Sequence, residues 1–352
     1  MENIKWGLIG CGNVVEKKSG PAFNTTPRSS IYAIMRRDIK KAEESAKKLG
    51  AKKWYNNVDE LLADEQVNAI YIATPPGLHL EQAIKCCKSK KPTYIEKPFA
   101  RNYKEALQIT EMFETEGIPL YIAHYRRALP KFRKIKEILQ SGKIGTIFEA
   151  DFRLNRKYNY EEIHNTWLYN TELSGGGKFY DIAPHSIDIM IYLLGNFIEV
   201  NGIATNNNKE YDVEDMVVMS FKTDTGVIGT ANFNSLALDK KDKMIIYGTK
   251  GKIEFSMHGN DPIIITTNEN EEKIEIDNPK IIQENMIKDV VDSLITGEHL
   301  HTCTGREALE TYRIMDIVLD KYYDGRDKDF WNRINYWNKR RNIWKKIWTK
   351  IM

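Results

Sequence analysis

The sequence predicts two domains, a doubly wound α/β domain followed by an α+β domain. The chain has 352 residues, which is more than one ordinary domain needs. Strand-like and helix-like segments alternate as far as about residue 125, and this pattern predicts a parallel sheet with helical crossovers. Short strands separated by turn residues follow, and they predict an antiparallel sheet. We therefore expect domains at 1–125 and 126–325, followed by a C-terminal extension at 326–352.

The composition indicates a soluble globular protein. Hydrophobic residues make up 41% of the chain and charged residues 29%. No apolar run approaches the roughly 18 residues that span a bilayer, and the N-terminus has no signal-peptide pattern. The four cysteines, Cys11, Cys86, Cys87 and Cys303, have no spacing typical of a disulfide framework or a zinc site. These observations predict a cytoplasmic protein that binds no metal.

The net charge of +3 is unevenly distributed. The segment from Trp331 onward holds seven Lys or Arg and no acid, which leaves −4 on the rest of the chain. We therefore expect no nucleic-acid partner for the body of the protein. Trp337, Trp344, Trp348 and Ile351 would form one stripe of a basic helix. We expect this stripe to pack on protein; contact with an anionic membrane and a disordered end are the alternatives.

The first fifteen residues contain a strand, a glycine turn and the start of a helix. The apolar run 4–9 ends at Gly10, and Gly12 follows one residue later. Backbone N–H groups at such a helix start bind the pyrophosphate of a dinucleotide. Gly10 permits the tight turn, and Gly12 lets the backbone approach the phosphates without a Cβ atom between them. Val15 stands where glycine or alanine would pack more closely, so the motif is incomplete.

Glu96, Lys97 and Pro98 follow the strand predicted at 92–95 in the first domain. Ligands of such sheets lie outside the carboxyl ends of the strands, so we expect Lys97 beside a bound nicotinamide. A lysine in this place can donate a hydrogen bond to a substrate hydroxyl and stabilise the oxyanion that forms as hydride leaves. The alternative is a solvated surface lysine.

A second group of polar residues lies in a helix predicted over 181–194. Asp181, His185 and Asp188 fall within an arc of about 60° on one helix face. A carboxylate one turn before a histidine can orient the ring and favour its protonated form, as a general acid/base requires. Pro184 is compatible with this helix because we expect it in the first turn. A helix cap at Asp181 with a buried histidine and a zinc site are the alternatives.

The end of the second predicted strand bears on the choice of cofactor. Arg36 and Arg37 follow this strand, where an acidic residue for the ribose would indicate NAD. Guanidinium groups suit the 2′-phosphate of NADP by charge and by geometry. We therefore expect NADP in preference to NAD, whereas the alternative places both arginines on the solvated face of the next helix.

The expected site residues fall into three groups. The cofactor-binding residues that we expect are Gly10, Gly12, Asn13, Val14, Arg36, Arg37, Thr74, Pro75, His79, Glu96 and Lys97. The expected catalytic residues are Lys97, Asp181 and His185. The expected substrate contacts are His124, Arg126, Trp167, Asp181 and His185.

Three motifs occur in the order Gly10-Cys-Gly12, Glu96-Lys97-Pro98 and Gly175-Gly-Gly177 with the Asp181, His185, Asp188 series. On this combination the chain resembles the Gfo/Idh/MocA oxidoreductases over about residues 3–325. The resemblance implies an N-terminal Rossmann domain and a C-terminal α+β domain with a large open, mostly antiparallel sheet. It implies that Lys97 is the lysine of the family's Glu-Lys-Pro motif and that Asp181 and His185 are its acid/base pair.

We therefore expect an NAD(P)-dependent oxidoreductase that acts at a ring carbinol carbon of a sugar, nucleotide sugar or cyclitol. His185 would move the hydroxyl proton, Asp181 would orient His185, and Lys97 would stabilise the developing oxyanion. The resemblance also implies a homodimer or homotetramer formed through the C-terminal sheet. A glycosidase that uses tightly held NAD for transient oxidation and a non-catalytic cofactor-binding scaffold are the alternatives.

Overall fold

The computed structural model describes residues 2–158, 167–208, 211–300, 302–327 and 329–333. The chain forms two compact units. Unit 1 comprises Met1–Ala100, Glu105–Arg133 and Asp277–Leu309, and unit 2 comprises Arg101–Lys104, Lys134–Ile276 and Glu310–Met352. We expected the second domain to continue without interruption from residue 126, whereas residues 277–309 belong to unit 1.

Unit 1 contains a six-stranded sheet in the order β3-β2-β1-β4-β5-β6, and every neighbouring pair is parallel. This confirms the doubly wound α/β domain. The strands are β1 (Ile4–Ile9), β2 (Ser29–Met35), β3 (Lys53–Tyr55), β4 (Ala69–Ile72), β5 (Thr93–Ile95) and β6 (Leu120–Ile122). The helices are α1 (Gly20–Thr25), α2 (Ile39–Leu49), α3 (Val58–Ala63), α4 (His79–Lys88), α5 (Tyr103–Thr115) and α10 (Glu284–Thr296).

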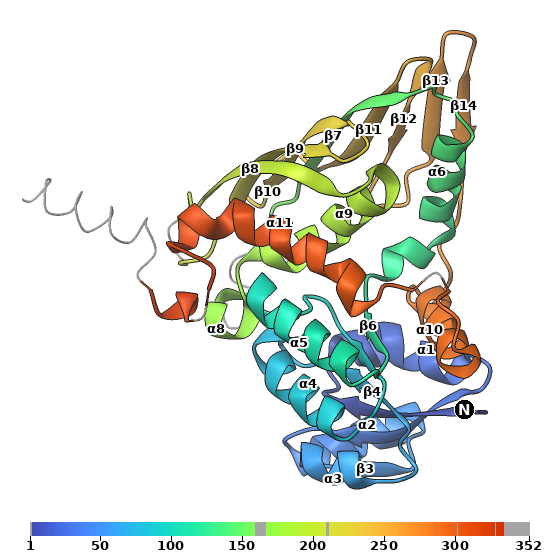
Figure 1. Ribbon diagram of the computed structural model, residues 1–352, viewed down its shortest axis with the longest axis vertical. Coiled ribbons are helices and arrows are strands. Elements are labelled where there is room, and N and C mark those ends of the chain that lie inside the picture. The colour runs from blue at the N-terminus through green and yellow to red at the C-terminus, as the bar shows by residue number, and fades with distance from the viewer. Residues whose placement is uncertain (1, 159–166, 209–210, 301, 328, 334–352) are drawn as a thin grey trace, which may run out of the picture. The chain divides into compact units, whose positions relative to one another are not determined.

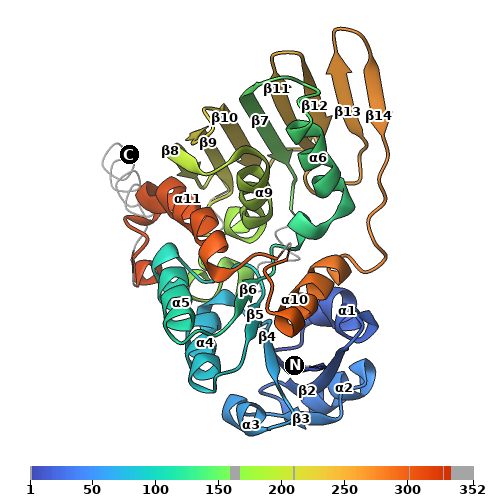
Figure 2. The same cartoon turned by 45° about the vertical axis from the view of Figure 1, so that its right-hand side comes forward.

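Helices cover both faces of this sheet, as the parallel crossovers require. In Figures 1 and 2, α1 and α10 lie on one side of the strands, and α4 and α5 lie on the other. Four aromatic side chains form a continuous buried row inside the unit, with ring centroids 4.9, 4.9 and 5.3 Å apart. They are Trp6, Phe23, Tyr71 and Tyr94. Tyr71 at the third position of this row also connects the core to the site described below.

Both ends of the helix α2 are set by local caps. Asp38 is its N-cap, and the carboxylate accepts hydrogen bonds from the backbone amides of Lys40 at 3.0 Å and Lys41 at 3.3 Å. Gly50 ends the helix in the left-handed conformation, with φ of 72°. Because the Asp38 carboxylate caps the helix, this acid after β2 already has a structural role.

Unit 2 contains an eight-stranded sheet in the order β14-β13-β12-β11-β7-β10-β9-β8. All neighbouring pairs are antiparallel except β7 with β10, which confirms the mostly antiparallel second sheet. The strands are β7 (Ile147–Asn155), β8 (Phe197–Thr205), β9 (Met216–Thr223), β10 (Ile228–Asn234), β11 (Lys241–Gly248), β12 (Gly251–Phe255), β13 (Ile263–Thr267) and β14 (Glu271–Ile274). The remaining helices are α6 (Pro130–Gln140), α8 (Thr171–Ser174), α9 (Lys178–Leu194) and α11 (Gly305–Tyr323).

One face of the second sheet is packed and the other is open. Along β9, Val217, Met219 and Phe221 are buried, whereas Val218 and Ser220 between them are exposed. This alternation has the period of two that a half-buried strand requires. Both ribbon views place α9 and α11 on one side of this sheet, as Figures 1 and 2 show.

The helix α9 begins earlier than the sequence indicated. Its first residue is Lys178, three residues before the predicted start at Asp181. Pro184 therefore lies inside the helix and not in its first turn, so the first-turn position that we predicted is wrong. Because proline has no N–H group, the helix lacks one backbone hydrogen bond at this position. A carboxylate from a distant segment accepts hydrogen bonds at this helix start, as described below.

The first part of the predicted C-terminal extension belongs to the core of unit 2. Arg326 and Phe330 are buried, and the Arg326 guanidinium lies 3.9 Å from the centroid of the Phe330 ring. The tail from residue 334 onward, which includes Trp337, Trp344 and Trp348, lies outside the described residues.

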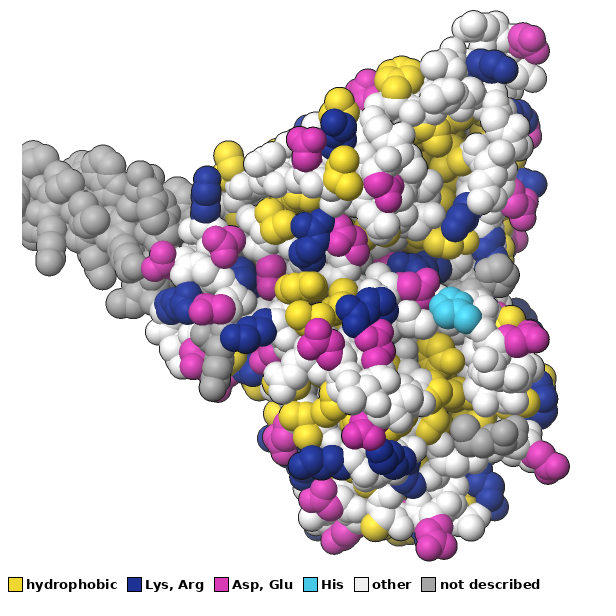
Figure 3. Space-filling view, viewed as in Figure 1, with side chains coloured by type: hydrophobic (Ala, Val, Ile, Leu, Met, Phe, Trp, Pro, Cys, Tyr) yellow, Lys and Arg dark blue, Asp and Glu magenta, His cyan; other side chains and the backbone are white. Residues whose placement is uncertain are grey.

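None of the described helices has the length and apolar character that crossing a membrane would need. Basic and acidic side chains lie interspersed on the face shown in Figure 3.

Candidate functional site

The turn after β1 contains two glycines, and the structure gives a different reason for glycine at each position. Gly10 has φ of 86°, and a Cβ atom there would lie 2.8 Å from Cγ2 of Thr74, so the fold itself requires glycine. Gly12 is exposed, and a Cβ atom there would meet no described protein atom within 4 Å. The fold does not require glycine at position 12, and the open space beside it is available to a ligand.

The helix that follows this turn begins at Asn13, and Asn13 and Val14 are exposed. It passes through a π-helical turn at Val15–Ser19 before it continues as α1. Val15, at the third position of the motif, is completely buried. The close backbone approach in this helix occurs at Gly20 instead, where a Cβ atom would lie 2.5 Å from the carbonyl oxygen of Val15. A buried valine is therefore compatible with the helix that starts beside Gly12.

The two arginines after β2 have different surroundings. Arg36 is half-buried; its Nη1 donates to Oγ of Ser45 at 2.8 Å and lies 3.8 Å from a carboxylate oxygen of Glu16. Arg37 is exposed. The neighbouring Asp38 caps α2, as described above. The end of β2 therefore presents one arginine held by neighbouring side chains and one exposed arginine.

His79 connects the loops that follow β4 and β5. One ring nitrogen, Nε2, lies 2.8 Å from the carbonyl oxygen of Thr74, and Nδ1 lies 3.1 Å from that of Phe99. The side chain is completely buried, and burial lowers the pKa of the imidazole. This full burial favours a role in holding the two loops together over the direct cofactor contact that we expected. Thr74 and Pro75, in the first of these loops, are half-buried.

A buried carboxylate holds the backbone of Lys97. Glu96 follows β5, and its Oε1 accepts hydrogen bonds from the Tyr71 hydroxyl at 2.5 Å and from Nε2 of Gln283 at 2.8 Å. Its Oε2 accepts one from the backbone amide of Lys97 at 3.1 Å. The Lys97 side chain is half-buried, and the Lys97–Pro98 peptide is cis. Glu96 therefore links the lysine to the aromatic row of the core and to the start of α10.

The remaining predicted residues of unit 1 follow β6. His124 is completely buried, and Arg126 is half-buried in a short 3-10 turn at Tyr125–Ala128. The Arg126 guanidinium lies 5.6 Å from the centroid of the Tyr125 ring. Because β1, β4, β5 and β6 are parallel, the residues after their carboxyl ends share one edge of the sheet. The structure thus groups Gly12, Thr74, Lys97 and His124 at this edge of unit 1.

In unit 2, Asp181 lies in the first turns of α9 beside a lysine. Nζ of Lys178 is 3.3 Å from Oδ2 of Asp181 and 4.6 Å from the centroid of the Tyr158 ring. Burial raises the pKa of Tyr158 to about 12, and the Asp181 charge acts in the same direction. Gly177, not Asp181, is the N-cap of α9, so the alternative in which Asp181 caps the helix is wrong.

His185 lies one turn after Asp181 and is 8% exposed. Its ring centroid is 6.3 Å from that of His258, and Nε2 of His258 lies 2.8 Å from Oγ of Ser186. Asp188, one turn further along, is almost completely buried. Among the described residues, no group of three or more His, Cys, Asp or Glu side chains is arranged to hold a metal ion.

Sequence reasoning missed His258, which the structure places beside the predicted histidine. The turn after β12 that carries His258 is held by Asp242, whose carboxylate accepts hydrogen bonds from the backbone amides of Met257, His258 and Gly259 at 3.0, 2.7 and 2.7 Å. His258 is 72 residues from Ser186 in the chain, so no local spacing could reveal the pair.

Trp167 lies in a 3-10 turn at Trp167–Tyr169 and is 37% exposed. The segment immediately before it, 159–166, is outside the described residues. Tyr169 in the same turn packs on Tyr211, with ring centroids 4.7 Å apart. A partly exposed indole is available for contact with a ligand, which is the role that we expected for Trp167.

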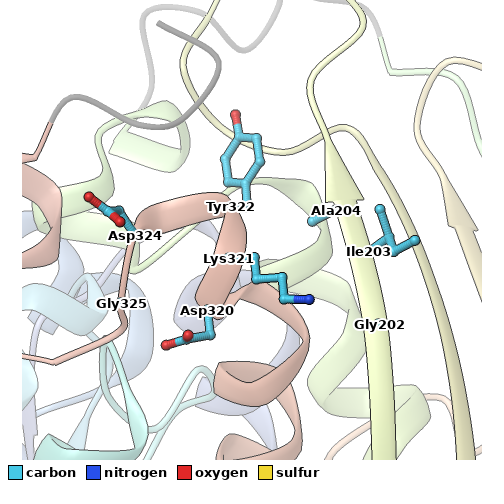
Figure 4. Close-up of a pocket in the computed structure, with 8 residues that line it drawn as sticks. All are labelled: Gly202, Ile203, Ala204, Asp320, Lys321, Tyr322, Asp324 and Gly325. Atoms are coloured by element: carbon cyan, nitrogen blue, oxygen red, sulfur yellow. The ribbon is translucent and has the colours of Figure 1, made fainter. Parts of the chain in front are cut away.

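A cavity of about 710 Å³ lies elsewhere in unit 2, between β8 and the C-terminal end of α11. Figure 4 shows apolar residues of β8 on one side and the side chains of Asp320, Lys321 and Tyr322 of α11 on the other. The lining residues are Gly202, Ile203, Ala204, Asp320, Lys321, Tyr322, Asp324 and Gly325. None of the predicted site residues is among them, so this cavity is separate from the candidate catalytic group.

Both units match known protein families. Residues 4–124 match the oxidoreductase family with an NAD-binding Rossmann fold, and residues 132–254 match the GFO/IDH/MocA C-terminal domain. Oxidoreductase P35 from Formosa agariphila is 38% identical over 320 residues, which cover 89% of this chain and 98% of that protein.

Solved structures have the same fold. Levoglucosan dehydrogenase in complex with NADH and levoglucosan has a TM-score of 0.82 at 21% identity, with 90% of this chain and 96% of that chain covered. KijD10, a 3-ketoreductase from Actinomadura kijaniata in complex with NADP and TDP-benzene, has a TM-score of 0.79 at 19% identity, with 90% and 97% covered. The chain therefore belongs to the Gfo/Idh/MocA family and is an oxidoreductase with an NAD-binding Rossmann domain.

Proposed function

We propose that this oxidoreductase transfers a hydride between a nicotinamide cofactor and a ring carbinol carbon of a sugar, nucleotide sugar or cyclitol. The observation that carries the proposal is the open space at Gly12, where the fold does not require glycine but a pyrophosphate does. Backbone amides of the helix start at Asn13 suit the phosphates. Levoglucosan dehydrogenase in complex with levoglucosan, which shares this fold, supports a sugar-like substrate.

The residues present fit such a cofactor and a carbinol substrate. When bound, the nicotinamide supplies the acceptor or donor of the hydride. His185 takes the proton from the substrate hydroxyl during oxidation and returns it during reduction. Asp181, one turn earlier on α9, orients the imidazole. Lys97, fixed at its backbone by Glu96, donates a hydrogen bond to the substrate oxygen and stabilises its developing charge.

The substrate class can be tested directly. Nucleotide sugars, aldoses and inositols should be offered with each nicotinamide cofactor while the cofactor absorbance is followed. We expect a change in absorbance with at least one of these classes. Cleavage of an intact glycoside without net reduction of the cofactor would instead support the glycosidase alternative.

The open space at Gly12 makes a testable prediction about cofactor binding. We expect Gly12→Ala to leave the melting temperature unchanged, because the new Cβ atom meets no described protein atom within 4 Å. It should weaken cofactor binding about tenfold or more, since the methyl group occupies the space of the phosphates. Gly10→Ala is the contrasting variant, which should destabilise the fold because of the φ of 86°. Unchanged cofactor affinity in Gly12→Ala would contradict this use of the turn.

The catalytic assignment predicts a loss of turnover without a loss of binding. Lys97→Ala and His185→Ala should each lower turnover by about 10²-fold or more, the usual scale for groups that position or transfer protons. Cofactor affinity, measured by titration, should stay within about threefold of wild type. His299→Ala is a suitable control, because this histidine is exposed and pairs with Glu307 at 3.1 Å. Near-normal turnover in either catalytic variant would refute its assigned role.

We further propose a preference for NADP(H) through the arginines after β2. A charged hydrogen bond contributes about 1.5–3 kcal/mol, so the double change Arg36→Gln and Arg37→Gln should weaken NADPH binding about tenfold or more and NADH binding much less. Arg37→Gln alone tests the exposed arginine without disturbing the bond between Arg36 and Ser45. Lys40→Gln is a control, because it removes an exposed charge from α2, the helix that follows these arginines. Equal losses for the two cofactors would mean that these arginines do not select the phosphate.

We also propose that the open face of the second sheet joins two copies of the chain in a homodimer, which can pair again to a homotetramer. Ile203 and Val218 are opposite each other on β8 and β9 and are 72% and 39% exposed. Ile228, which is 60% exposed, lies on the same face of β10. Three exposed apolar side chains on one sheet face favour contact with another protein surface.

The predicted interface can be tested by light scattering after gel filtration. Ile203→Asp combined with Val218→Asp should convert the assembly to a smaller species, because a charge cannot be buried there without a partner. Leu238→Asp provides a matched control, since Leu238 is 85% exposed but lies outside the strands of the sheet. An unchanged mass in the double variant would exclude this face as the interface.

A further inference from the structure

The N-terminus of α9 lacks the local cap that a helix of this length normally has. The first amides of any helix have no acceptor within the helix and need one from outside. The N-cap residue is Gly177, which has no side chain to accept a hydrogen bond, and the first turn contains Lys178 and Asp181. The position of this turn determines where Asp181, and His185 after it, are placed.

A carboxylate from a distant segment supplies the missing acceptor. Oε1 of Glu214 accepts hydrogen bonds from the backbone amides of Gly177 at 2.8 Å and Tyr180 at 3.3 Å. Glu214 lies 37 residues after Gly177, just before β9, and is 1% exposed. A negative charge at a helix N-terminus also interacts favourably with the helix dipole.

The glycines before α9 allow this approach. A Cβ atom at Gly177 would lie 2.5 Å from the carbonyl oxygen of Glu214 and 2.9 Å from Cβ of Val213. A Cβ atom at Gly176 would lie 2.7 Å from Cβ of Tyr180. A side chain at Gly177 would push the 213–214 segment away from the helix, and one at Gly176 would push against Tyr180. The glycine motif therefore makes room for the Glu214 cap.

The Glu214 carboxylate is itself held in place. Its Oε2 accepts a hydrogen bond from the Tyr323 hydroxyl at 2.5 Å. Burial raises the pKa of Glu214, whereas the hydrogen bonds from Tyr323 and the backbone and the charge of Arg326 act in the opposite direction. Arg326 is ion-paired with Asp316 at 3.0 Å and stacks on Tyr180 at 4.9 Å. The residues around the carboxylate thus fix its position relative to the helix start.

We propose that Glu214 is a positioning residue that fixes the first turn of α9 and thereby places Asp181 and His185 for proton transfer. The role in proton transfer rests on the proposed function, whereas the position of the first turn does not. Glu214 acts through backbone amides alone and does not contact the substrate. The inference predicts one effect on the helix start and a second on catalysis, which separate measurements can detect.

Three variants of the full-length protein test the proposal. Glu214→Ala removes both acceptor oxygens, and Glu214→Gln keeps an amide oxygen that can accept from Gly177. Asp316→Asn is the matched control, because it removes a second carboxylate of the same cluster, the half-buried one next to Arg326, but leaves the α9 amides capped. Each variant is measured by hydrogen exchange of the Gly177–Asp181 amides, by melting temperature and by steady-state kinetics.

We expect Glu214→Ala to speed exchange of the Gly177 and Tyr180 amides about tenfold or more, as the loss of a helix cap implies. Its kcat should fall about tenfold or more, while the KM for the cofactor stays within about twofold. Glu214→Gln should recover most of both losses. Asp316→Asn should lower the melting temperature. Its exchange at these amides and its kcat should stay close to those of the wild type.

Each alternative result has a defined meaning. Equal losses of kcat in Asp316→Asn and Glu214→Ala, at equal losses of melting temperature, would overturn the positioning role and indicate general destabilisation. Unchanged exchange at Gly177 and Tyr180 in a folded Glu214→Ala protein would also overturn it. If the wild-type protein turns over no carbinol substrate, the proposed function fails, and the exchange measurement alone decides on the helix start.

Discussion

In each unit a buried carboxylate accepts hydrogen bonds from the backbone and thereby holds the candidate site residues in place. Glu96 accepts from the amide of Lys97 in unit 1, and Glu214 accepts from the amides of Gly177 and Tyr180 in unit 2. Such a group is costly to bury unless all its oxygens are paired. Each carboxylate also accepts a hydrogen bond from a tyrosine hydroxyl, Glu96 from Tyr71 and Glu214 from Tyr323. The core therefore controls the backbone of the site more directly than the surface does.

The sequence predicts the alternating strands and helices of the first domain and the antiparallel sheet of the second, whereas three strands at the edges of these sheets have little hydrophobic pattern. β3 is at one edge of the first sheet, and β8 and β14 are the two edges of the second. An edge strand has a neighbour on one side only and carries more polar or exposed residues, which weakens the hydrophobic pattern. β14, with the sequence Glu-Glu-Lys-Ile, has no fully buried residue, so periodicity could not reveal it.

The sequence suggests those residues of the candidate site that follow a strand or share a helix. It does not suggest residues that come together only when the chain folds. Gly12, Lys97 and the Asp181–His185 pair follow local rules of spacing. His258 reaches His185 from a turn after β12, and Glu214 caps α9 from 37 residues away, so neither leaves a local pattern. The predicted start of α9 at Asp181 lies three residues too late, and the acceptor at the observed start also comes from the distant residue Glu214.

The surroundings of His185 include a second histidine from a different element. The two ring centroids lie 6.3 Å apart. Oγ of Ser186 lies 2.8 Å from Nε2 of His258, and Asp242 accepts hydrogen bonds from the backbone of the turn that carries His258, so this ring keeps a fixed place near His185. A description limited to the helix motif would omit this imidazole, because it comes from the turn after β12 and not from α9.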